Sequence, residues 1–194
     1  MPNLRPLGRM ELYSDAYYIE RIVAGDTGCF ACLLDKYSRP VHSLILKMVR
    51  NKEDAEELAQ DVFMKVFRNL PSFKADCSFS TWIYRIAYNT AISELRRKKQ
   101  EFVAIEESQI SNVSEEAVSE LLGSVSPTEQ LDRLEAALTL LPPDERALIL
   151  LFYMKEKTVE ELTVITGFSA SNIKVKLHRI RKKLFVLIKG MEEK

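Results

Sequence analysis

The chain has 194 residues, of which 46% are hydrophobic and only 13 are proline or glycine (seven and six), which is typical of a packed, mostly helical protein of one or two small domains. No window reaches the roughly 18 apolar residues of a membrane helix, and the N-terminus lacks an apolar signal core, so we expect a cytoplasmic protein without membrane insertion. The formal net charge is zero, from 28 Lys plus Arg and 28 Asp plus Glu, which taken alone argues against nucleic-acid binding.

Residues 14–50 predict two helices behind a poorly ordered lead, residues 1–13. Pro40 lacks a backbone N–H, so it should bend or interrupt the second helix. The expected boundaries are Ser14 or Asp15 as the cap of the first helix, Gly25 at its end, and Asp26 as the cap of the second helix, which runs to about Arg50.

The three cysteines, Cys29, Cys32 and Cys77, are too few and too irregularly spaced for a disulfide scaffold. Cys29 and Cys32 have the C-x-x-C spacing of redox and zinc sites. A structural zinc needs four ligands, however, and a redox enzyme of this type needs a βαβ context that the sequence lacks. Because the pair lies inside a helical apolar pattern, we favour buried or half-buried cysteines and expect no metal site.

Residues 52–70 predict an amphipathic helix capped by Asn51. Its expected buried side consists of Ala55, Leu58, Ala59, Val62, Phe63, Val66 and Phe67. The remaining surface is acidic and carries a methionine; Asp54, Glu57, Gln60, Asp61 and Met64 lie on or beside it. Acidic residues are favoured near a helix N-terminus, so a solvated face and a binding surface are equally good interpretations at this point.

A loop over residues 71–80 precedes a long helix that starts at Ser80 or Thr81 and ends in four cations, residues 96–99. One face of this helix is apolar, with Ile83, Tyr84, Ala87, Tyr88, Ala91 and Leu95. A second stripe combines an aromatic ring, cations, an amide and a hydroxyl: Trp82, Arg85, Asn89, Ser93 and Arg96. This combination suits a nucleic-acid surface.

Residues 101–130 are acidic and contain only scattered apolar residues, which predicts a flexible linker. From Glu101 to Glu135 there are nine acidic residues and one basic residue, Arg133, whereas the flanking segments contain cationic clusters. The zero net charge therefore hides a basic, acidic, basic layout.

Residues 158–189 predict a helix-turn-helix. Thr158 can cap the first helix, and Glu161 is placed to complete a capping box. Gly167 permits the left-handed conformation that ends this helix, and Ser169 can cap the next one. The second helix has a buried stripe formed by Ile173, Leu177, Ile180, Leu184 and Leu187.

The outward side of the second helix is basic, with six cations from Lys174 to Lys183 and no acidic residue between Ala170 and Lys189. Phosphate neutralisation requires cations, and short polar side chains near the start of the helix suit contacts with base edges. A solvated basic face is the alternative. The capped turn before it favours DNA binding.

Four motifs together resemble the extracytoplasmic-function (ECF) class of the sigma-70 superfamily of bacterial transcription initiation factors. In the family's order and spacing, they are DAEELAQDVF at 54–63, FSTWIYRIAYN at 79–89, LPPDER at 141–146 and KVKLHRIRKKL at 174–184, and the match covers about residues 15–188. The resemblance implies an all-α fold of two small helical domains, sigma region 2 over residues 14–100 and sigma region 4 over residues 131–190, joined by the flexible acidic linker. It also implies an alternative sigma factor that binds core RNA polymerase and directs promoter-specific initiation, with no catalysis of its own and no cofactor.

The resemblance assigns the first domain to polymerase binding and to the −10 element. The acidic face of residues 52–70 matches the surface that docks on the clamp helices of the polymerase β′ subunit, which implies a core-binding set of Asp54, Glu57, Gln60, Asp61 and Met64. The loop over residues 74–80 and the helix after it match the part that recognises and melts the −10 element, where the loop and Asn89 hold an unstacked base. The implied −10 set is Lys74, Ser80, Arg85, Asn89, Ser93, Arg96 and Arg97, whereas Trp82 fits the core better.

The resemblance assigns the helix-turn-helix to the −35 element, read in the major groove, and to the polymerase β flap. The implied −35 set is Ser169, Ser171, Asn172, Lys174, Val175, Lys176, His178, Arg179 and Lys182. Asn172 and Val175 stand where the family more often has Thr and Ser, and Val175 lies opposite the buried stripe. We therefore hypothesise that Val175 contacts a thymine methyl group.

Family members are often held by an anti-sigma factor, so the resemblance implies such a partner. In this family the linker between the two domains threads the RNA exit path of the polymerase, so the resemblance implies that the acidic residues of this chain mimic nucleic acid there. The alternative function is an autonomous helix-turn-helix transcriptional regulator. Such a regulator would bind promoter DNA unaided and carry a ligand cavity, for which the sequence has no signature.

Overall fold

The computed structural model describes residues 13–98, 110, 113–114 and 127–192, and its regular elements are helices. In chain order they are α1 (Asp15–Val23), η1 (Thr27–Cys29), α2 (Phe30–Val49), α3 (Lys52–Asn69), η2 (Leu70–Ser72), α4 (Phe79–Arg97), α7 (Pro127–Leu140), α8 (Pro143–Tyr153), α9 (Val159–Thr166) and α10 (Ala170–Glu192). Most of the predicted lead and of the predicted acidic linker lies outside the described residues. The all-α prediction is confirmed.

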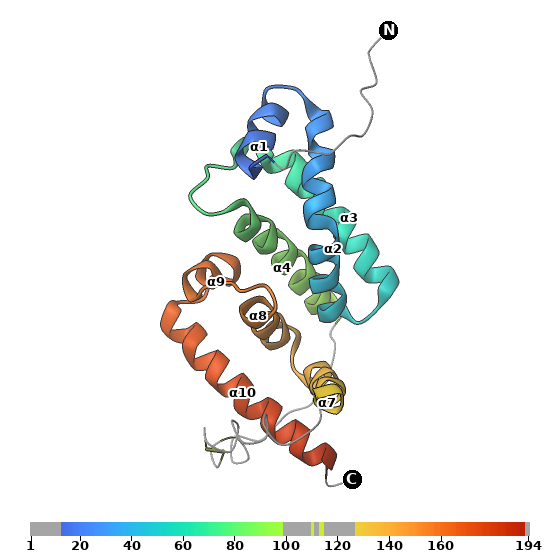
Figure 1. Ribbon diagram of the computed structural model, residues 1–194, viewed down its shortest axis with the longest axis vertical. Coiled ribbons are helices and arrows are strands. Elements are labelled where there is room, and N and C mark those ends of the chain that lie inside the picture. The colour runs from blue at the N-terminus through green and yellow to red at the C-terminus, as the bar shows by residue number, and fades with distance from the viewer. Residues whose placement is uncertain (1–12, 99–109, 111–112, 115–126, 193–194) are drawn as a thin grey trace.

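The helices form two groups along the long axis of the molecule (Figure 1). In the N-terminal group α2 packs against α3 and α4, and α3 packs against α4. In the C-terminal group the long α10 packs against α7, α8 and α9. The prediction of two helical domains is therefore confirmed.

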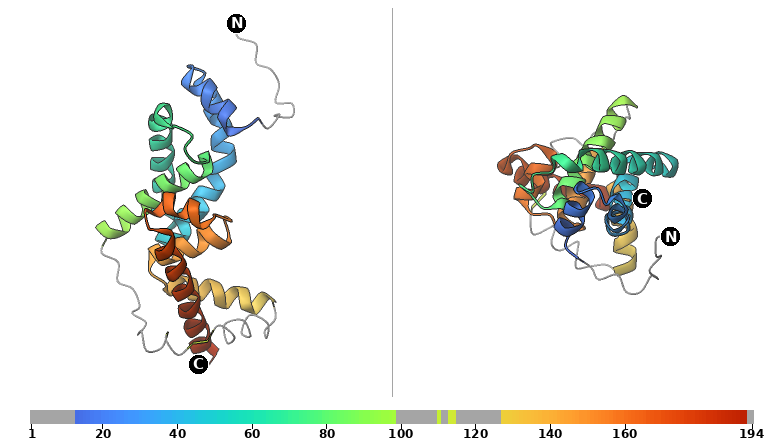
Figure 2. Two further views of the ribbon diagram at one scale, coloured as in Figure 1. Left: turned by 90° about the vertical axis from the view of Figure 1, so that its left-hand side faces the viewer. Right: turned by 90° about the horizontal axis from the view of Figure 1, so that it is seen from above.

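The two groups also contact each other. Helix α4 packs against α9, and α2 packs against α8; the left view of Figure 2 shows α8 and α9, in orange, against α4, in green. The buried side chains of both groups belong to one apolar core. The described parts of the chain therefore form one packed body.

Several helix ends follow from the capping residues predicted in the sequence. Ser14 Oγ accepts the N–H of Tyr17 at 3.3 Å at the start of α1, and Asn51 Oδ1 accepts the N–H of Asp54 at 2.8 Å at the start of α3. Both side chains satisfy a backbone donor that has no partner within its helix. These two caps are confirmed.

The predicted boundary between the first two helices is wrong at Asp26. Residues Thr27–Cys29 form a 3₁₀ turn, α2 starts only at Phe30, and the Asp26 side chain makes no capping hydrogen bond. Its carboxylate binds Arg21 instead, with Oδ2 at 2.6 Å from Nη2. Helix α1 correspondingly ends at Val23, before Gly25, which has a φ of 105°.

Pro40 does not interrupt α2, which continues from Phe30 to Val49. A proline removes only one backbone hydrogen bond of a helix. Tyr37 before it and Val41 and Leu44 after it are buried, so packing holds both halves of the helix against the core.

The helix after the loop over residues 71–80 starts earlier than predicted. Helix α4 begins at Phe79, and its N-cap is Ser78, whose Oγ accepts the N–H of Thr81 at 3.1 Å. Ser78, Ser80 and Thr81 all carry a hydroxyl that can cap a helix. The hydroxyls of Ser80 and Thr81 instead make longer-range hydrogen bonds, described below.

Candidate nucleic-acid interface

The helix-turn-helix has the local geometry that its sequence predicts. Thr158 Oγ1 accepts the N–H of Glu161 at 3.1 Å, and Glu161 Oε2 accepts the N–H of Thr158 at 3.1 Å, which completes the capping box. Gly167 ends α9 in the left-handed conformation, with a φ of 78°. Ser169 Oγ accepts the N–H of Asn172 at 3.3 Å. These bonds fix where α10 starts relative to α9.

Helix α10 has a buried stripe and an open face, as its sequence predicts. The stripe consists of Ile173, Leu177, Ile180 and Leu184, which are buried, and Leu187, which is partly buried. Of the predicted −35 residues, Ser169, Ser171, Asn172, Lys174, Val175 and Arg179 are exposed, while Lys176, His178 and Lys182 are half-buried. Val175 is 56% exposed, so packing does not explain an apolar residue there.

Two lysines of α10 are held by acidic residues of α8. Lys183 Nζ lies 2.6 Å from Glu145 Oε1, and the side chain of Lys183 is only 16% exposed. Lys176 lies 3.8 Å from Asp144 and over the ring of Phe168, 4.9 Å from its centroid. The idea that all six cations of α10 face outward is therefore wrong at Lys183, which anchors α10 to α8.

The predicted nucleic-acid stripe on α4 is open to solvent. Arg85, Asn89, Ser93 and Arg96 are all exposed along one side of the helix. Trp82 is half-buried and packs against the rings of Phe73 and Phe79, with centroids 5.1 and 5.8 Å away. Its position in this aromatic cluster agrees with the interpretation of Trp82 as a core residue. In the preceding loop Lys74 is exposed.

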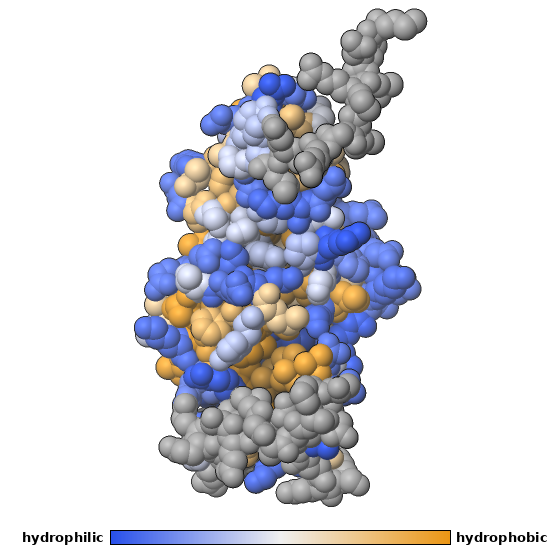
Figure 3. Space-filling view, viewed as in Figure 1, coloured by the Kyte–Doolittle hydropathy of each residue, from blue (hydrophilic) through white to orange (hydrophobic). Residues whose placement is uncertain are grey.

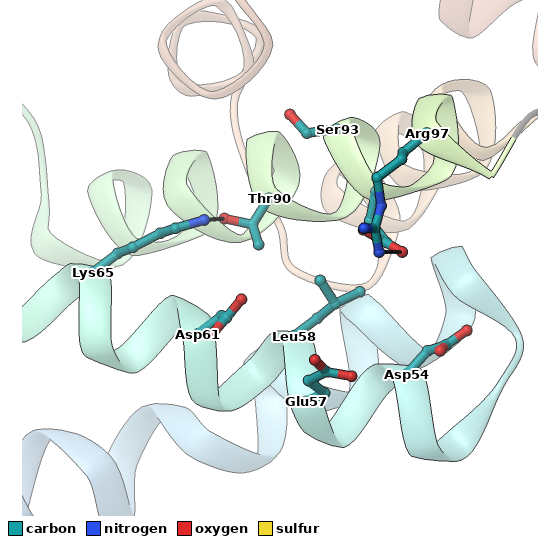
Figure 4. A pocket seen from close by; sticks show the side chains of 9 residues that line it. Asp54, Glu57, Leu58, Asp61, Lys65, Thr90, Ser93 and Arg97 are labelled. Atoms are coloured by element: carbon teal, nitrogen blue, oxygen red, sulfur yellow. Dashed lines mark hydrogen bonds and ion pairs between the residues drawn. The ribbon is translucent and has the colours of Figure 1, made fainter.

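Arg97, also in the predicted −10 set, points into a groove between α3 and α4 (Figure 4). The groove has a volume of about 430 Å³ and carries four carboxylates, on Asp54, Glu57, Asp61 and Glu94. Arg97 Nη2 binds Glu94 at 2.8 Å. The hydrogen bond to Glu94 raises the pKa of Arg97, so the guanidinium stays charged. Arg97 therefore lies beside the acidic surface of α3, away from the stripe of Arg85 and Asn89.

The acidic surface of α3 is largely exposed. Glu57, Gln60, Asp61 and Met64 face solvent, and Met64 is 51% exposed. Asp54 is half-buried because its carboxylate binds Lys98 Nζ at 2.6 Å. On the predicted buried side of α3, Ala55, Leu58, Ala59, Val62 and Val66 are buried and Phe63 is partly buried. The prediction is wrong at Phe67, which is 37% exposed and packs edge-on against Phe30.

The C-x-x-C cysteines are half-buried thiols; Cys29 is the last residue of η1, and Cys32 lies in the first turn of α2. Burial raises the pKa of Cys29, and the hydrogen bond of its thiol to Asp26, at 3.4 Å, raises it further. A raised pKa lowers the fraction of reactive thiolate. Within residues 13–98, 110, 113–114 and 127–192, no three metal-ligating side chains form a group that could hold a metal ion.

Comparison with known proteins follows the same division of the chain. The family model of sigma-70 region 2 matches residues 33–101, and that of sigma-70 region 4 matches residues 131–184. The ECF RNA polymerase sigma factor SigW of Bacillus subtilis (strain 168) is 30% identical over 172 residues, which cover 86% of this chain and 92% of SigW. The chain belongs to the ECF class of the sigma-70 family. The ECF RNA polymerase sigma-E factor of Escherichia coli (strain K12) is also 30% identical, over 89% of this sigma factor and 93% of its own length.

Two solved structures share the fold of this sigma factor. CnrH, in complex with the cytosolic domain of CnrY, has a TM-score of 0.66 at 19% identity and covers 91% of this chain and 97% of its own. The sigma factor RpoE from Bartonella quintana, in complex with the anti-sigma factor NepR, has a TM-score of 0.61 at 24% identity, covering 82% and 96%. At these identities the likeness concerns the fold.

Membership of this family establishes the general role of the protein. A sigma factor binds core RNA polymerase and promoter DNA and directs transcription initiation, and it is not an enzyme. None of the described helices combines the length and the apolar character needed to cross a membrane. The match to region 2 contains most of α2 and all of α3 and α4, and the match to region 4 contains α8, α9 and most of α7 and α10.

One contact between the regions involves the predicted −10 residue Ser80. Lys157 Nζ, from region 4, donates to Ser80 Oγ at 2.7 Å and to Glu161 Oε1 at 2.7 Å. The same Glu161 oxygen accepts a hydrogen bond from Thr81 Oγ1 on α4. Lys157 also lies over the ring of Tyr84, 5.8 Å from its centroid. Lys157 and Thr81 are both buried, and Ser80 and Glu161 are half-buried, so this polar cluster lies between the regions with one edge open to solvent.

The charge of Glu161 is stabilised by this cluster. Burial alone would raise the pKa of its carboxyl group, but hydrogen bonds from Lys157, Thr81 and the N–H of Thr158 lower it to about 2. The two oxygens of Glu161 therefore have separate tasks: Oε2 caps α9, and Oε1 binds region 2.

A second contact between the regions is made by Arg146 of α8, which is only 2% exposed. Its guanidinium donates to the backbone oxygens of Lys47 (2.8 Å) and Met48 (3.4 Å) at the end of α2. It also donates to those of Thr139 (2.9 Å) and Leu141 (2.7 Å) at the end of α7. Burial and the nearby Arg50 lower the pKa of Arg146 to about 10, so the group remains charged at neutral pH. Carbonyl groups at helix C-termini favour such a cation.

Sequence reasoning did not find these contacts between the regions. Lys157 precedes the helix-turn-helix without matching any motif, and Arg146 belongs to the LPPDER motif, whose pattern does not reveal its partners. The one available signal was a charged residue at position 146 next to an apolar run of residues 147–153, since a charge in such a setting needs buried partners.

Proposed function

We propose that the acidic surface of α3 binds the clamp helices of the polymerase β′ subunit through Asp54, Glu57, Gln60, Asp61 and Met64. Four of these five side chains are exposed in one area, and Met64 adds a flexible apolar contact at its edge. Three carboxylates of this surface, on Asp54, Glu57 and Asp61, also line the groove between α3 and α4 and supply negative charge for a basic partner. The exposed Met64 among carboxylates is the observation that carries this assignment.

We further propose that the loop of residues 74–80 and the exposed stripe of α4 bind the −10 element. Arg85 and Arg96 supply cations for phosphates, and Asn89, one turn after Arg85, supplies an amide for a base edge. Lys74 and Ser80 bind from the loop side. Ser93 and Arg97 complete the set at the far end of the helix, where Arg97 exchanges its bond to Glu94 for a phosphate.

In the same proposal α10 reads the −35 element with its exposed first turns, from Ser169 to Arg179. Its half-buried residues Lys176, His178 and Lys182 contact the flanking phosphates. Apolar side chains gather over α8 and α10 in Figure 3, and the described part of region 4 exposes Tyr153 and Met154 at the end of α8 by 54% and 55%. We assign the exposed end of α8, with Tyr153 and Met154, to the polymerase β flap, because exposed apolar side chains mark protein contacts.

The relatives suggest where and with whom this sigma factor works. We propose that it acts in the cytoplasm and that an anti-sigma factor holds it until a signal releases it. Support comes from RpoE of B. quintana, which has the same fold and was solved with the anti-sigma factor NepR.

The proposal is tested by transcription with core RNA polymerase. Asp61→Arg reverses a charge in the proposed docking surface, and Asp35→Arg makes the same change at an exposed position on α2. We expect D61R to weaken binding to core polymerase at least tenfold and to reduce specific initiation in parallel, while D35R leaves both unchanged. Equal effects of the two variants would reject the assignment. Specific promoter binding by the chain alone, without stimulation of core polymerase, would instead favour an autonomous regulator.

A further inference from the structure

A small cavity lies where the end of α2 meets α7 and α8. Its volume is about 270 Å³, slightly below the range of roughly 300–1,000 Å³ that is typical of pockets for drug-sized ligands. Each of the three helices contributes one leucine to its wall: Leu46 from α2, Leu138 from α7 and Leu150 from α8. The cavity therefore has room and apolar surface for a small organic molecule.

The charged side chains around this cavity do not balance. Among the described residues that line it, Glu135 is the only one with a carboxylate, and this carboxylate is paired with Lys47, whose Nζ lies 3.3 Å from Oε1. Arg50 and Arg146 line the cavity as well. Neither guanidinium forms an ion pair with a carboxylate in the part of the chain that the structure describes. Two positive charges at the cavity are thus left without a counter-ion.

The two unpaired guanidiniums meet at one backbone oxygen. Arg50 Nη1 donates to the carbonyl oxygen of Thr139 at 3.1 Å, and Arg146 Nη2 donates to the same oxygen at 2.9 Å. Burial lowers the pKa of Arg146, and the positive charge of Arg50 lowers it further. The carbonyl groups at the ends of α2 and α7 supply only partial negative charge. Since buried charges in proteins are normally paired, this arrangement calls for an anion.

Arg146 also has one N–H group without an acceptor. Its Nη1 and Nη2 atoms donate to four backbone oxygens, and these bonds use all the N–H groups of the two atoms. The remaining donor, Nε, is buried and has no hydrogen-bond partner. A buried donor without an acceptor is rare and destabilising. An anion that reaches both Nε and Arg50 would satisfy this donor and neutralise the pair.

We propose that this cavity binds a small monocarboxylate, with its carboxylate between Arg146 Nε and Arg50 and its apolar body against the three leucines. A carboxylate is the anion that a guanidinium binds through short, charge-assisted hydrogen bonds. The cavity volume limits the body to about six carbons. The ligand contacts region 2 through α2 and region 4 through α7 and α8. None of the residues named for this site belongs to the proposed −10, −35 or core-binding sets.

The experiment uses hexanoate as the probe, titrated into the ¹⁵N-labelled full chain at constant ionic strength. The readout is the NMR signal of the Arg146 Nε–H group, which is identified by its loss in Arg146→Lys. We expect a saturable shift of this signal with a Kd of about 1 mM or below. Two matched compounds separate the charge from the apolar body: hexanol lacks the carboxylate, and acetate lacks the chain. Each should bind at least about tenfold more weakly than hexanoate.

Three variants of the full chain test whether the probe binds in this cavity. Arg50→Met removes one of the two guanidiniums and should raise the Kd of hexanoate about tenfold. Arg39→Met removes an exposed arginine elsewhere on α2 and should leave the Kd unchanged. Leu138→Phe fills the cavity without altering a charge and should also weaken binding at least about tenfold. Circular dichroism checks that each variant keeps its helices.

The site is refuted if hexanoate does not shift the Arg146 Nε–H signal, or if R50M and L138F bind hexanoate as tightly as R39M does. Equal affinity for hexanol would reject the carboxylate, because the cavity would then select only an apolar body. Equal affinity for acetate would reject the apolar body, because the two arginines would then hold any small anion. The proposed core-binding and DNA-binding surfaces stand or fall separately, since they share no residue with this site.

Discussion

Replacing Arg146 by methionine tests whether the buried guanidinium holds the two regions together. Arg146→Met keeps an unbranched apolar side chain but removes four hydrogen bonds, two to the end of α2 and two to the end of α7. Hydrogen bonds from a charged donor contribute about 1.5–3 kcal/mol each, and relief of the buried charge offsets part of their loss. We expect a net destabilisation of about 3 kcal/mol.

The measurement is thermal unfolding of the full chain followed by circular dichroism. For a chain of this size, 1 kcal/mol corresponds to about 2–4 °C, so R146M should unfold roughly 6–12 °C below wild type. Arg146→Lys should fall in between, because one ammonium group cannot reach both helix ends as the planar guanidinium does. The control is Arg39→Met on the exposed side of α2, which should change the midpoint by less than about 2 °C.

The reasoning fails if R146M unfolds within about 2 °C of wild type, the range expected for a surface substitution. That result would mean that water or neighbouring side chains replace the guanidinium at the four carbonyl oxygens at little cost. A large drop for both R146M and R39M would also count against it, because the effect would then not depend on burial.

Three further predictions concern region 4. Glu161 has a folded-state pKa of about 2, below its ordinary 4.5, so its contribution to the free energy of unfolding is complete above pH 4.5 and is lost as the pH falls towards 2. In urea unfolding at pH 7, E161Q should therefore be less stable than wild type by on the order of 2 kcal/mol. A stability difference between the two proteins that does not narrow below pH 4.5 would contradict this. Gly167 has a φ of 78°, and no atom lies within 4 Å of an added Cβ. G167A should therefore lose about 1–2 kcal/mol of stability from backbone strain alone, and G167N should lose less. Equal thermal midpoints for the two variants would be the contrary result. Val175→Ser should weaken −35 binding by about 1 kcal/mol at a single base pair, measured with a series of substituted duplexes, and uniform weakening at every position would reject the thymine-methyl contact.

Local capping and helical periodicity were predictable from the sequence because they depend on neighbours a few residues apart. The capping box of Thr158 and Glu161, the left-handed Gly167 and the buried stripe of α10 are confirmed. The open stripe of Arg85 and Asn89 on α4 also agrees with the helical wheel. For these features one helical turn contains all the information that is needed.

The predictions were wrong where a distant partner changed a local preference. Asp26 has a side chain that can cap a helix, but it binds Arg21 instead. The N-cap of α4 is Ser78 and not a residue at 80 or 81, and the hydroxyl of Thr81 donates to Glu161. Phe67 lies on the apolar side of the helical wheel, yet it is at the margin of the bundle and remains partly exposed. A single sequence without its fold does not show which of several equivalent hydroxyls or rings meets a partner 80 residues away.

The four hydrogen bonds of Arg146 go to backbone oxygens, which bears on hybrids that combine region 2 of this chain with region 4 of a relative. Because the guanidinium binds carbonyl groups, its hydrogen bonds depend on where α2 and α7 end and not on the side chains at those positions. Region 4 of a relative with an arginine at the equivalent position should therefore dock on region 2 of this chain, provided that its helices end at matching residues. Such hybrids should keep this contact even where the side chains at the ends of α2 and α7 differ, provided that the apolar side chains shared by the two regions are retained.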